Sequence, residues 1–273
     1  MAITRKDYTE EAVKAARSVL LELIHLLGEY REDIVVIGGW VPELLMPGDH
    51  TGSMDIDLAL NHKTLQDAGY RTIQKLLRDR GYREHDEQPF IFFRDIHVEG
   101  NPVTVQVDLL AGEYEGASRS HRHQRIQDVL ARKVRGCDLA FDMCEEVSID
   151  GLLPDGARDV GTVRVAGIVP FLVMKGMALH DRLKEKDAWD VYYCVRQYPG
   201  GLDALVNAFA PHIGHGLVRE GLAKIAAKFQ SPEHIGPKQV ADFDELTDKE
   251  SIEIRRRDAF ERVHAFLDRL GII

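Results

Sequence analysis

Residues 34–60 read IVVIGGWVPELLMPGDHTGSMDIDLAL, and this stretch decides the fold class that the sequence predicts. Its first four residues are apolar and β-branched, as in a buried strand, and the run ends at Gly38-Gly39. The next six residues favour a short helix. A loop rich in turn-forming residues then leads to MDIDLAL at 54–60, where apolar and polar residues alternate as in a strand with one buried face.

The sequence on either side of this stretch extends the mixed pattern. Apolar residues recur at helical spacing between Val13 and Leu27, which predicts an amphipathic helix before the first strand. The segments expected after the second strand are a helix over 63–80, strands over 91–98 and 103–110, short strands and turns over 145–166, and helices over 168–182, 187–197, 201–209, 216–229 and 249–270.

The change from a mixed pattern to a purely helical one places a domain boundary near residue 167. We therefore expect an α/β (α+β) core, a mixed sheet flanked by helices, over residues 1–167. A C-terminal helical domain is expected over residues 168–273. A chain of 273 residues is long enough to bury a sizeable core in this arrangement.

Composition and charge exclude several classes of protein. The 35 Lys and Arg residues against 45 Asp and Glu give a net charge of −10, which disfavours a protein that coats duplex nucleic acid. No apolar run approaches about 18 residues, so neither a membrane span nor a membrane partner is expected. The first 20 residues lack the apolar core of a signal peptide. Three cysteines without a CxxC pair favour a reducing, cytoplasmic compartment.

Two basic clusters stand out against the acidic composition. One is Arg255-Arg256-Arg257 on the last predicted helix, which fits an RNA contact but is more simply explained by pairing with the neighbouring Asp258 and Glu261. The other is the most basic stretch before residue 150, which fits either contact with an anionic acceptor such as RNA or a solvated helix face. Its members are Arg119, Arg122, Arg125, Arg132, Lys133 and Arg135.

Three aspartates form the most informative pattern in the chain. Asp55 and Asp57, at positions i and i+2 of one strand, project from the same face about 6 to 7 Å apart along the chain. Asp108 lies on the polar face of a later strand. Three carboxylates gathered from two strands are typical of a site for two divalent cations that assists in-line attack at phosphorus.

The glycine pair completes this constellation. Gly38-Gly39, where the first strand gives way to a helix, lets the backbone approach a polyphosphate, and the helix N-terminus offers free N–H groups. Ser53 or Thr51 can add a hydroxyl contact to phosphate. Taken alone, each feature also fits a turn or a solvated strand face. Their fixed order favours a metal-dependent phosphate site.

The stretch from Ile37 to Leu60 resembles the signature of the polymerase-β-like nucleotidyltransferase superfamily, a strand, G-[GS], a spacer and D-x-D, with a third acidic residue on a later strand. The resemblance implies a mixed-sheet nucleotidyltransferase core, two Mg²⁺ ions (with Mn²⁺ as a substitute) and transfer of a nucleoside monophosphate from an NTP to a hydroxyl. It implies that Asp55, Asp57 and Asp108 are catalytic metal ligands.

A second match narrows this resemblance. FLVMKGMALHDRLKEKDAWDVYYCV, residues 171–195, resembles the helical region of AbiEii/AbiGii-like toxin nucleotidyltransferases, where a Lys-bearing helix precedes K-D-x-x-D. The two matches span roughly residues 34–198. They imply that Gly38, Gly39, Lys175 and Asp187 bind the nucleotide, and Ser53 is expected to join them through its hydroxyl. A competing interpretation is that Asp187 only caps its helix and that Lys186 is solvated.

The resemblance leaves the acceptor and the partners open. A toxin of this subgroup is expected to act on RNA, with tRNA as the favoured acceptor, and to have a cognate antitoxin. The subgroup often carries an Arg shortly before D-x-D, whereas this loop has His50. The alternatives are transfer to a small molecule, as in aminoglycoside nucleotidyltransferases, transfer to a protein, and a non-catalytic nucleotide-binding partner in a toxin–antitoxin pair.

Overall fold

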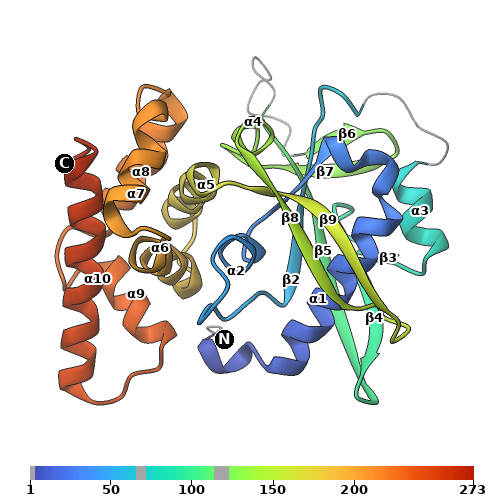
Figure 1. Ribbon diagram of the computed structural model, residues 1–273, viewed down its shortest axis with the longest axis horizontal. Coiled ribbons are helices and arrows are strands. Elements are labelled where there is room, and N and C mark those ends of the chain that lie inside the picture. The colour runs from blue at the N-terminus through green and yellow to red at the C-terminus, as the bar shows by residue number, and fades with distance from the viewer. Residues whose placement is uncertain (1–3, 66–71, 114–122) are drawn as a thin grey trace. The chain divides into compact units, whose positions relative to one another are not determined.

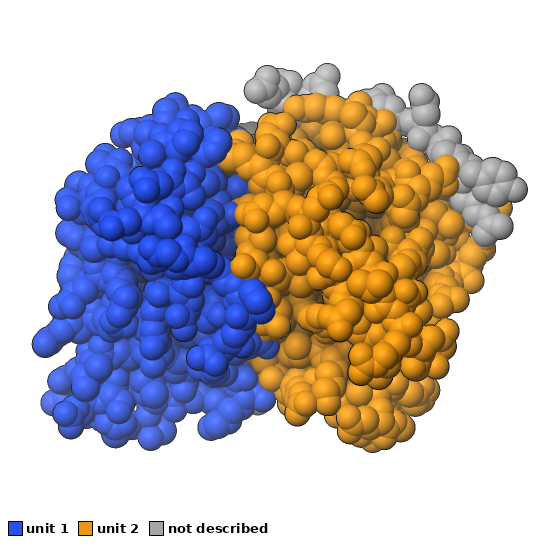
Figure 2. Space-filling view, in the orientation of Figure 1, with its two compact units in different colours: residues 1–7, 46–51, 168–273 blue, residues 8–45, 52–167 orange. Residues whose placement is uncertain are grey.

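The computed structural model describes residues 4–65, 72–113 and 123–273. The chain forms two compact units, coloured separately in Figure 2. Unit 1 contains residues 1–7, 46–51 and 168–273, and unit 2 contains residues 8–45 and 52–167. The long helical part of unit 1 therefore begins directly after Gly167. Two earlier segments of the chain, residues 1–7 and 46–51, also belong to unit 1.

Unit 2 is built on a mixed sheet, nine-stranded within the described residues (Figure 1). The strand order is β3-β4-β5-β2-β1-β9-β8, with β7 paired to both β5 and β6. Strand β2 runs antiparallel to β1 and parallel to β5, and β9 runs parallel to β1. The mixed sheet confirms the predicted fold class. The strands are β1 (Ile34–Ile37), β2 (Asp55–Leu60), β3 (Arg83–Glu84), β4 (Ile91–Val98), β5 (Asn101–Ala111), β6 (His123–Ile126), β7 (Val129–Lys133), β8 (Cys144–Leu152) and β9 (Arg158–Ala166).

One long helix covers the apolar side of this sheet. Helix α1 (Glu10–Leu26) begins at Thr9, whose side chain accepts a hydrogen bond from the Ala12 amide at 3.2 Å, as a capping threonine does. Its apolar stripe packs against β4, β5, β8 and β9. The remaining helical segments of unit 2 are α2 (Trp40–Leu45), α3 (Ile73–Asp79), α4 (Leu139–Asp142) and the 3₁₀ segment η2 (Gly28–Asp33).

The two central strands show the alternation that the sequence predicts. On β2, Ile56 and Leu58 are buried, whereas Asp55 and Asp57 are only half-buried. On β5, the alternate positions Val105, Val107 and Leu109 are buried, and the residues between them face the other way. The sheet therefore has one apolar face under α1 and one face on which its acidic residues lie.

Two expectations about unit 2 need correction. The helix expected over 63–80 begins only at Ile73, because Thr72 caps its first turn and Asn61 accepts from the Lys63 amide in a competing side-chain turn. Residues 66–71 lie outside the described part of the chain.

The basic stretch before residue 150 is not a helix face where it is described. Its described members lie on or beside a β-hairpin, because the β-branched and apolar residues of 126–131 pair β6 with β7. Arg119 and Arg122 lie outside the described residues.

Unit 1 is helical, and its predicted helices are found within two residues of their expected ends. The α-helix over 235–243 was not predicted, and its first residues include Gly236 and Pro237, which usually break helices. Pro237 instead occupies the first turn, where no backbone hydrogen bond is lost. The segments are η1 (Arg5–Asp7), α5 (Ile168–Asp181), α6 (Glu185–Gln197), α7 (Gly201–Phe209), η3 (Ala210–His212), α8 (Gly216–Lys228), α9 (Ile235–Phe243) and α10 (Lys249–Arg269).

The core of unit 1 combines close helix crossings with aromatic packing. Helices α5 and α8 cross where Gly176 faces Gly221, so closely that an added Cβ at Gly176 would lie 2.1 Å from the Gly221 carbonyl oxygen. The rings of Trp189 and Phe243 pack at 5.1 Å between centroids. In the described part of the chain, no helix has the length and apolarity needed to cross a bilayer.

Candidate functional site

The sheet of unit 2 brings the three predicted aspartates onto one face. Strands β2 and β5 are parallel neighbours, and their register places Asp57 opposite Asp108 and Asp55 opposite Gln106. Residues paired across two parallel strands project from the same face of the sheet. The carboxylates of Asp57 and Asp108 therefore lie on adjacent strands at the same level, and Asp55 lies two residues earlier on that face.

The N-terminal end of β2 is fixed by two contacts to Asp55. The buried Ser53 hydroxyl donates to the Asp55 carboxylate at 2.6 Å, and the Trp40 indole N–H donates to the Asp55 carbonyl oxygen at 3.0 Å. In this arrangement Ser53 orients a carboxylate, whereas the sequence predicts that it contacts nucleotide. Trp40 follows the glycine pair directly, so its buried ring links the turn after β1 to the start of β2.

Asp108 has a partner that sequence reasoning missed. The Gln106 side-chain amide donates to the Asp108 carboxylate at 2.8 Å. The signal was present in the sequence, because residues two apart on a strand share a face, but a Gln between valines carries no distinctive motif.

Gly38 gives the Asp57 carboxylate the space that it occupies. Gly38 has φ +71°, in the left-handed region, and an added Cβ would lie 1.8 Å from Asp57 Oδ2. Antiparallel pairing of Ile37 with Asp57 brings the two strands to this contact. A glycine is therefore required here for both backbone conformation and space. Gly39 is buried and leads into α2.

The carboxylates have the chemistry of a site for hard divalent cations, because carboxylate oxygens are the ligands that such cations prefer. Because Gly38 has no side chain, the Asp57 carboxylate has the space that it needs to direct its oxygens toward a ligand. In the described residues, no group of three or more His, Cys, Asp or Glu side chains is already gathered at metal-binding spacing. Asp55 and Asp108 each accept a hydrogen bond on one carboxylate oxygen, from Ser53 and from Gln106, and such bonds orient a carboxylate ligand.

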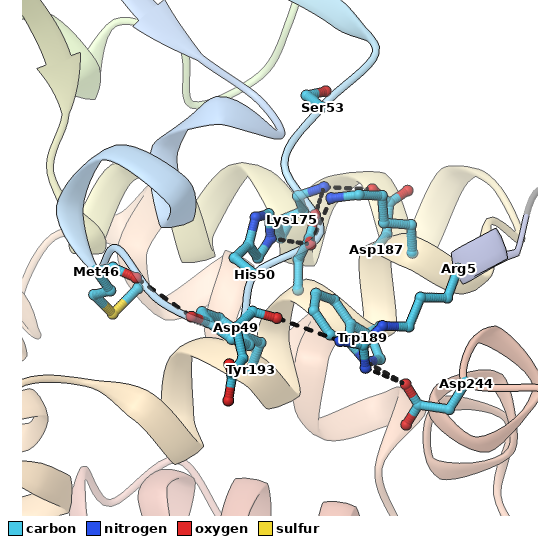
Figure 3. A network of polar contacts seen from close by, with 12 residues as sticks. Arg5, Met46, Asp49, His50, Ser53, Lys175, Asp187, Trp189, Tyr193 and Asp244 are labelled. Atoms are coloured by element: carbon cyan, nitrogen blue, oxygen red, sulfur yellow. Dashed lines mark hydrogen bonds and ion pairs between the residues drawn. The ribbon is translucent and has the colours of Figure 1, made fainter. Parts of the chain in front are cut away.

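Lys175 and Asp187 belong to unit 1 and form part of a buried ionic cluster there (Figure 3). The Lys175 ammonium lies 2.8 Å from Asp187 Oδ1 and 2.7 Å from Asp190 Oδ2. The Arg182 guanidinium, half exposed, donates to both oxygens of Asp187. Lys175 thus has its charge balanced within the protein, whereas the sequence predicts that it binds the nucleotide.

Asp190 joins this cluster to the segment 46–51. Its Oδ1 lies 2.8 Å from the Lys186 ammonium and 3.1 Å from His50 Nε2. The same segment is held by the Tyr193 hydroxyl, which donates to the Met46 carbonyl oxygen at 3.3 Å. Figure 3 shows the contact between Met46 and Tyr193 and the position of His50 in the same segment. The cluster therefore fastens an early loop of the chain to the helical unit.

The competing interpretation of K-D-x-x-D is wrong. Lys186 is 4% exposed and therefore not solvated, and the N-terminus of α6 has no side-chain cap hydrogen bond from Asp187. His50 was not connected to this motif in the sequence analysis, because 140 residues separate it from Asp190.

Burial and mutual attraction set the charge states in the cluster. Burial acts to raise the pKa of Asp187, but Lys175 and Arg182 outweigh it and lower that pKa to about 2. Burial acts to lower the pKa of Lys175, but Asp187 and Asp190 outweigh it and raise the pKa above its usual range. Burial and the Lys186 charge lower the pKa of His50 to about 4, against the opposing effect of Asp190. His50 is therefore neutral at pH 7.

Comparison with known solved structures finds a weak likeness. No protein-family model matches the chain, and no curated protein matches it. The crystal structure of an antigenic nucleotidyltransferase-like protein from Paracoccidioides brasiliensis is similar, with a TM-score of 0.44 and 13% sequence identity. The match covers 84% of this chain and 91% of that chain.

Proposed function

We propose that this chain is a nucleotidyltransferase that transfers a nucleoside monophosphate from an NTP to an acceptor hydroxyl. The observation that carries the proposal is the register of β2 and β5, which sets Asp57 beside Asp108 with Asp55 on the same face. The glycine that makes room for Asp57 supports it further.

The proposed reaction assigns a role to each of these groups. Asp55, Asp57 and Asp108 would hold two Mg²⁺ ions, or Mn²⁺, which supply positive charge at the reacting phosphate and lower the pKa of the acceptor hydroxyl. The acceptor oxygen forms a bond to the α-phosphorus, the bond from that phosphorus to the bridging oxygen of the β-phosphate breaks, and pyrophosphate leaves. Asp108 accepts the hydroxyl proton. The backbone N–H groups of the Gly38-Gly39 turn donate to phosphate oxygens.

A nucleotide contact of Lys175 and Asp187 remains a prediction from the sequence. Both are buried and already paired with opposite charges, which favours a role in holding residues 46–51 and α6 in place. The three cysteines are free, which suits the reducing cytoplasm in which we expect the enzyme to act.

RNA, with tRNA foremost, is the leading acceptor, and we propose a cognate antitoxin as the partner of such a toxin. Transfer to a small molecule or to a protein hydroxyl is the second candidate. The net charge of −10 favours this second candidate, because an acidic protein repels an RNA backbone unless it has a local basic surface.

A labelling experiment tests the proposal and separates the acceptors. The full chain is incubated with each of the four NTPs carrying a radiolabelled α-phosphate, and with total RNA, a protein extract or a panel of aminoglycosides. We expect Mg²⁺-dependent label in one pool and its loss on chelation with EDTA. Absence of transfer from every NTP to all three pools would contradict the proposal.

A further inference from the structure

Unit 1 contains a second polar feature that the proposed reaction does not use. It is a small pocket of about 120 Å³ formed by residues of the N-terminal segment, the 46–51 loop, α6 and α10. Its lining, which we call the arginine pocket, consists of Arg5, Asp49, Trp189, Tyr192, Tyr193, Arg196, Gln197 and Arg255.

The lining of the arginine pocket is positively charged. It carries three guanidinium groups against the single carboxylate of Asp49, although the chain as a whole has a net charge of −10. An adjacent buried carboxylate, Asp244, lies within ion-pair distance of both Arg5 and Arg255. With Asp244 counted, and with the nearby Asp258 balanced by its ion pair with Arg262, one positive charge remains in excess.

The three guanidinium groups are positioned over aromatic rings. Arg5 lies 5.7 Å from the centre of the Trp189 ring and approaches the Asp49 carbonyl oxygen and the Asp244 carboxylate, each at 3.5 Å (Figure 3). The Trp189 indole N–H donates to Asp244 at 2.9 Å, so the indole ring and the Arg5 guanidinium contact the same carboxylate. Stacking of this kind restricts the rotamers of an exposed arginine before any ligand arrives.

Arg196 and Arg255 share the ring of Tyr192. Their guanidinium carbons lie 5.9 Å and 5.6 Å from its centre. Arg196 also donates to the Tyr192 hydroxyl at 3.2 Å, and that hydroxyl donates to Asp258. Arg255 pairs with Asp244, outside the last helix, and not within that helix as its sequence neighbours predict.

Arg196 supplies the excess charge, because the Asp258 carboxylate on which it also acts is paired with Arg262. It is exposed, and among the described residues no carboxylate lies within 4 Å of its guanidinium group. Its fork of N–H donors is therefore held in place on Tyr192 with donors left for a ligand.

We propose that the arginine pocket binds the phosphate group of a phosphate ester. Guanidinium groups match phosphate in charge and in the spacing of their paired donors. Sites that enclose a drug-sized molecule measure about 300 to 1,000 Å³, so a pocket of 120 Å³ suits a phosphate group and leaves the rest of the ester outside. The ester is either a free monoester or a diester of a nucleic-acid backbone. This inference does not depend on the proposed transferase activity.

Calorimetric titration of the full chain tests the proposal with three probes. They are inorganic phosphate, AMP as a monoester and the dinucleotide ApA as a diester. We expect saturable binding that weakens as salt rises, because part of the attraction is between solvent-exposed charges. Tighter binding of AMP than of ApA identifies a monoester as the ligand, and the reverse order identifies a nucleic-acid backbone.

Two substitutions with opposite expected effects sharpen the test. Arg196→Gln removes the unbalanced charge and should weaken binding about tenfold, the equivalent of one charge-assisted contact. Asp49→Asn removes the opposing carboxylate and should tighten binding severalfold. Lys249→Gln, in an exposed ion pair with Glu253 on α10 and outside the lining of the pocket, is the matched control and should change the affinity less than about twofold.

Thermal unfolding verifies that each variant is folded. The proposal is overturned if no probe binds saturably at concentrations up to about 10 mM. It is equally overturned if the folded Arg196→Gln and Asp49→Asn variants bind all three probes as the unmodified protein does, or shift affinity in the same direction.

Discussion

At the scale of single residues, the candidate site depends on the absence of a side chain at Gly38, next to the charged side chain of Asp57. Gly38 leaves the volume in which the Asp57 carboxylate lies, and its φ of +71° is one that residues with a Cβ rarely adopt. Catalytic groups must be held to within a fraction of an ångström of their working positions. The backbone at Gly38, directly after β1, therefore determines the position of the Asp57 carboxylate.

Gly38→Ala should impair the proposed activity far more than it impairs folding. The new methyl group must displace Asp57, and displacements of about 1 Å in an active site lower rates by about 100-fold. Gly28→Ala is the control, because an added Cβ there meets nothing within 4 Å. Comparison of kcat for the two variants checks this. Equal rates for both would contradict the role of Gly38.

Removing Lys175 should destabilise the protein strongly. Lys175→Met leaves the Asp187 and Asp190 carboxylates without their shared cation, and breaking a buried ion pair from one side costs about 3 to 5 kcal/mol. Lys249→Met, which removes an exposed lysine near Glu253, should cost less than about 0.5 kcal/mol. Urea unfolding measures both, and similar losses in the two variants would argue against a structural role for Lys175.

His50 should make stability depend on pH. Its pKa is about 4 in the folded protein and 6.5 without the fold, so between pH 6.5 and 4 the unfolded chain takes up a proton that the folded one does not. The free energy of unfolding should therefore fall as the pH falls through this window, by about 1 kcal/mol per pH unit.

His50→Gln should flatten the pH dependence of stability, whereas His180→Gln, at an exposed histidine on α5, should leave it unchanged. Urea unfolding at a series of pH values measures both slopes. An unaltered slope in the His50 variant would contradict the assignment.

At the scale of elements, the sequence was informative where a periodic pattern is local. The strand at 34–37 and the helices at 40–45 and 201–209 have the ends that the pattern predicts, because burial on one face repeats within a few residues. Elements that depend on distant partners were missed. The β6–β7 hairpin attaches to β5 through β7, and α9 starts with residues that usually break helices.

The crossing of α5 and α8 should be intolerant of any added side chain. Gly176→Ala would place a methyl group 2.1 Å from the Gly221 carbonyl oxygen, so the helices must separate, at a cost of about 3 kcal/mol. Gly216→Ala, at the exposed start of α8, should instead stabilise by about 0.5 kcal/mol through helix propensity. Thermal unfolding distinguishes the two, and a neutral Gly176 variant would contradict this packing.

At the scale of the whole molecule, the two units differ in how far sequence could describe their polar sites. The face shared by Asp55 and Asp57 follows from strand alternation alone, and the register that adds Asp108 pairs strands about 50 residues apart. The ionic cluster of unit 1 could not be foreseen as a whole, because the partner of Asp190 in the 46–51 loop is 140 residues away. Local patterns identify such residues singly, and only folding shows which of them meet.

The central claim is that carboxylates on β2 and β5 carry out nucleotidyl transfer. Asp57→Asn keeps the size of the side chain and removes its charge, and Asp86→Asn does the same at an exposed turn position. Both variants are compared with the unmodified protein for Mg²⁺-dependent transfer of α-labelled NMP to whichever acceptor pool is labelled. The account predicts a loss of at least about 1,000-fold for Asp57→Asn and an unchanged rate for Asp86→Asn. Transfer by folded Asp57→Asn at the rate of the unmodified protein would contradict it.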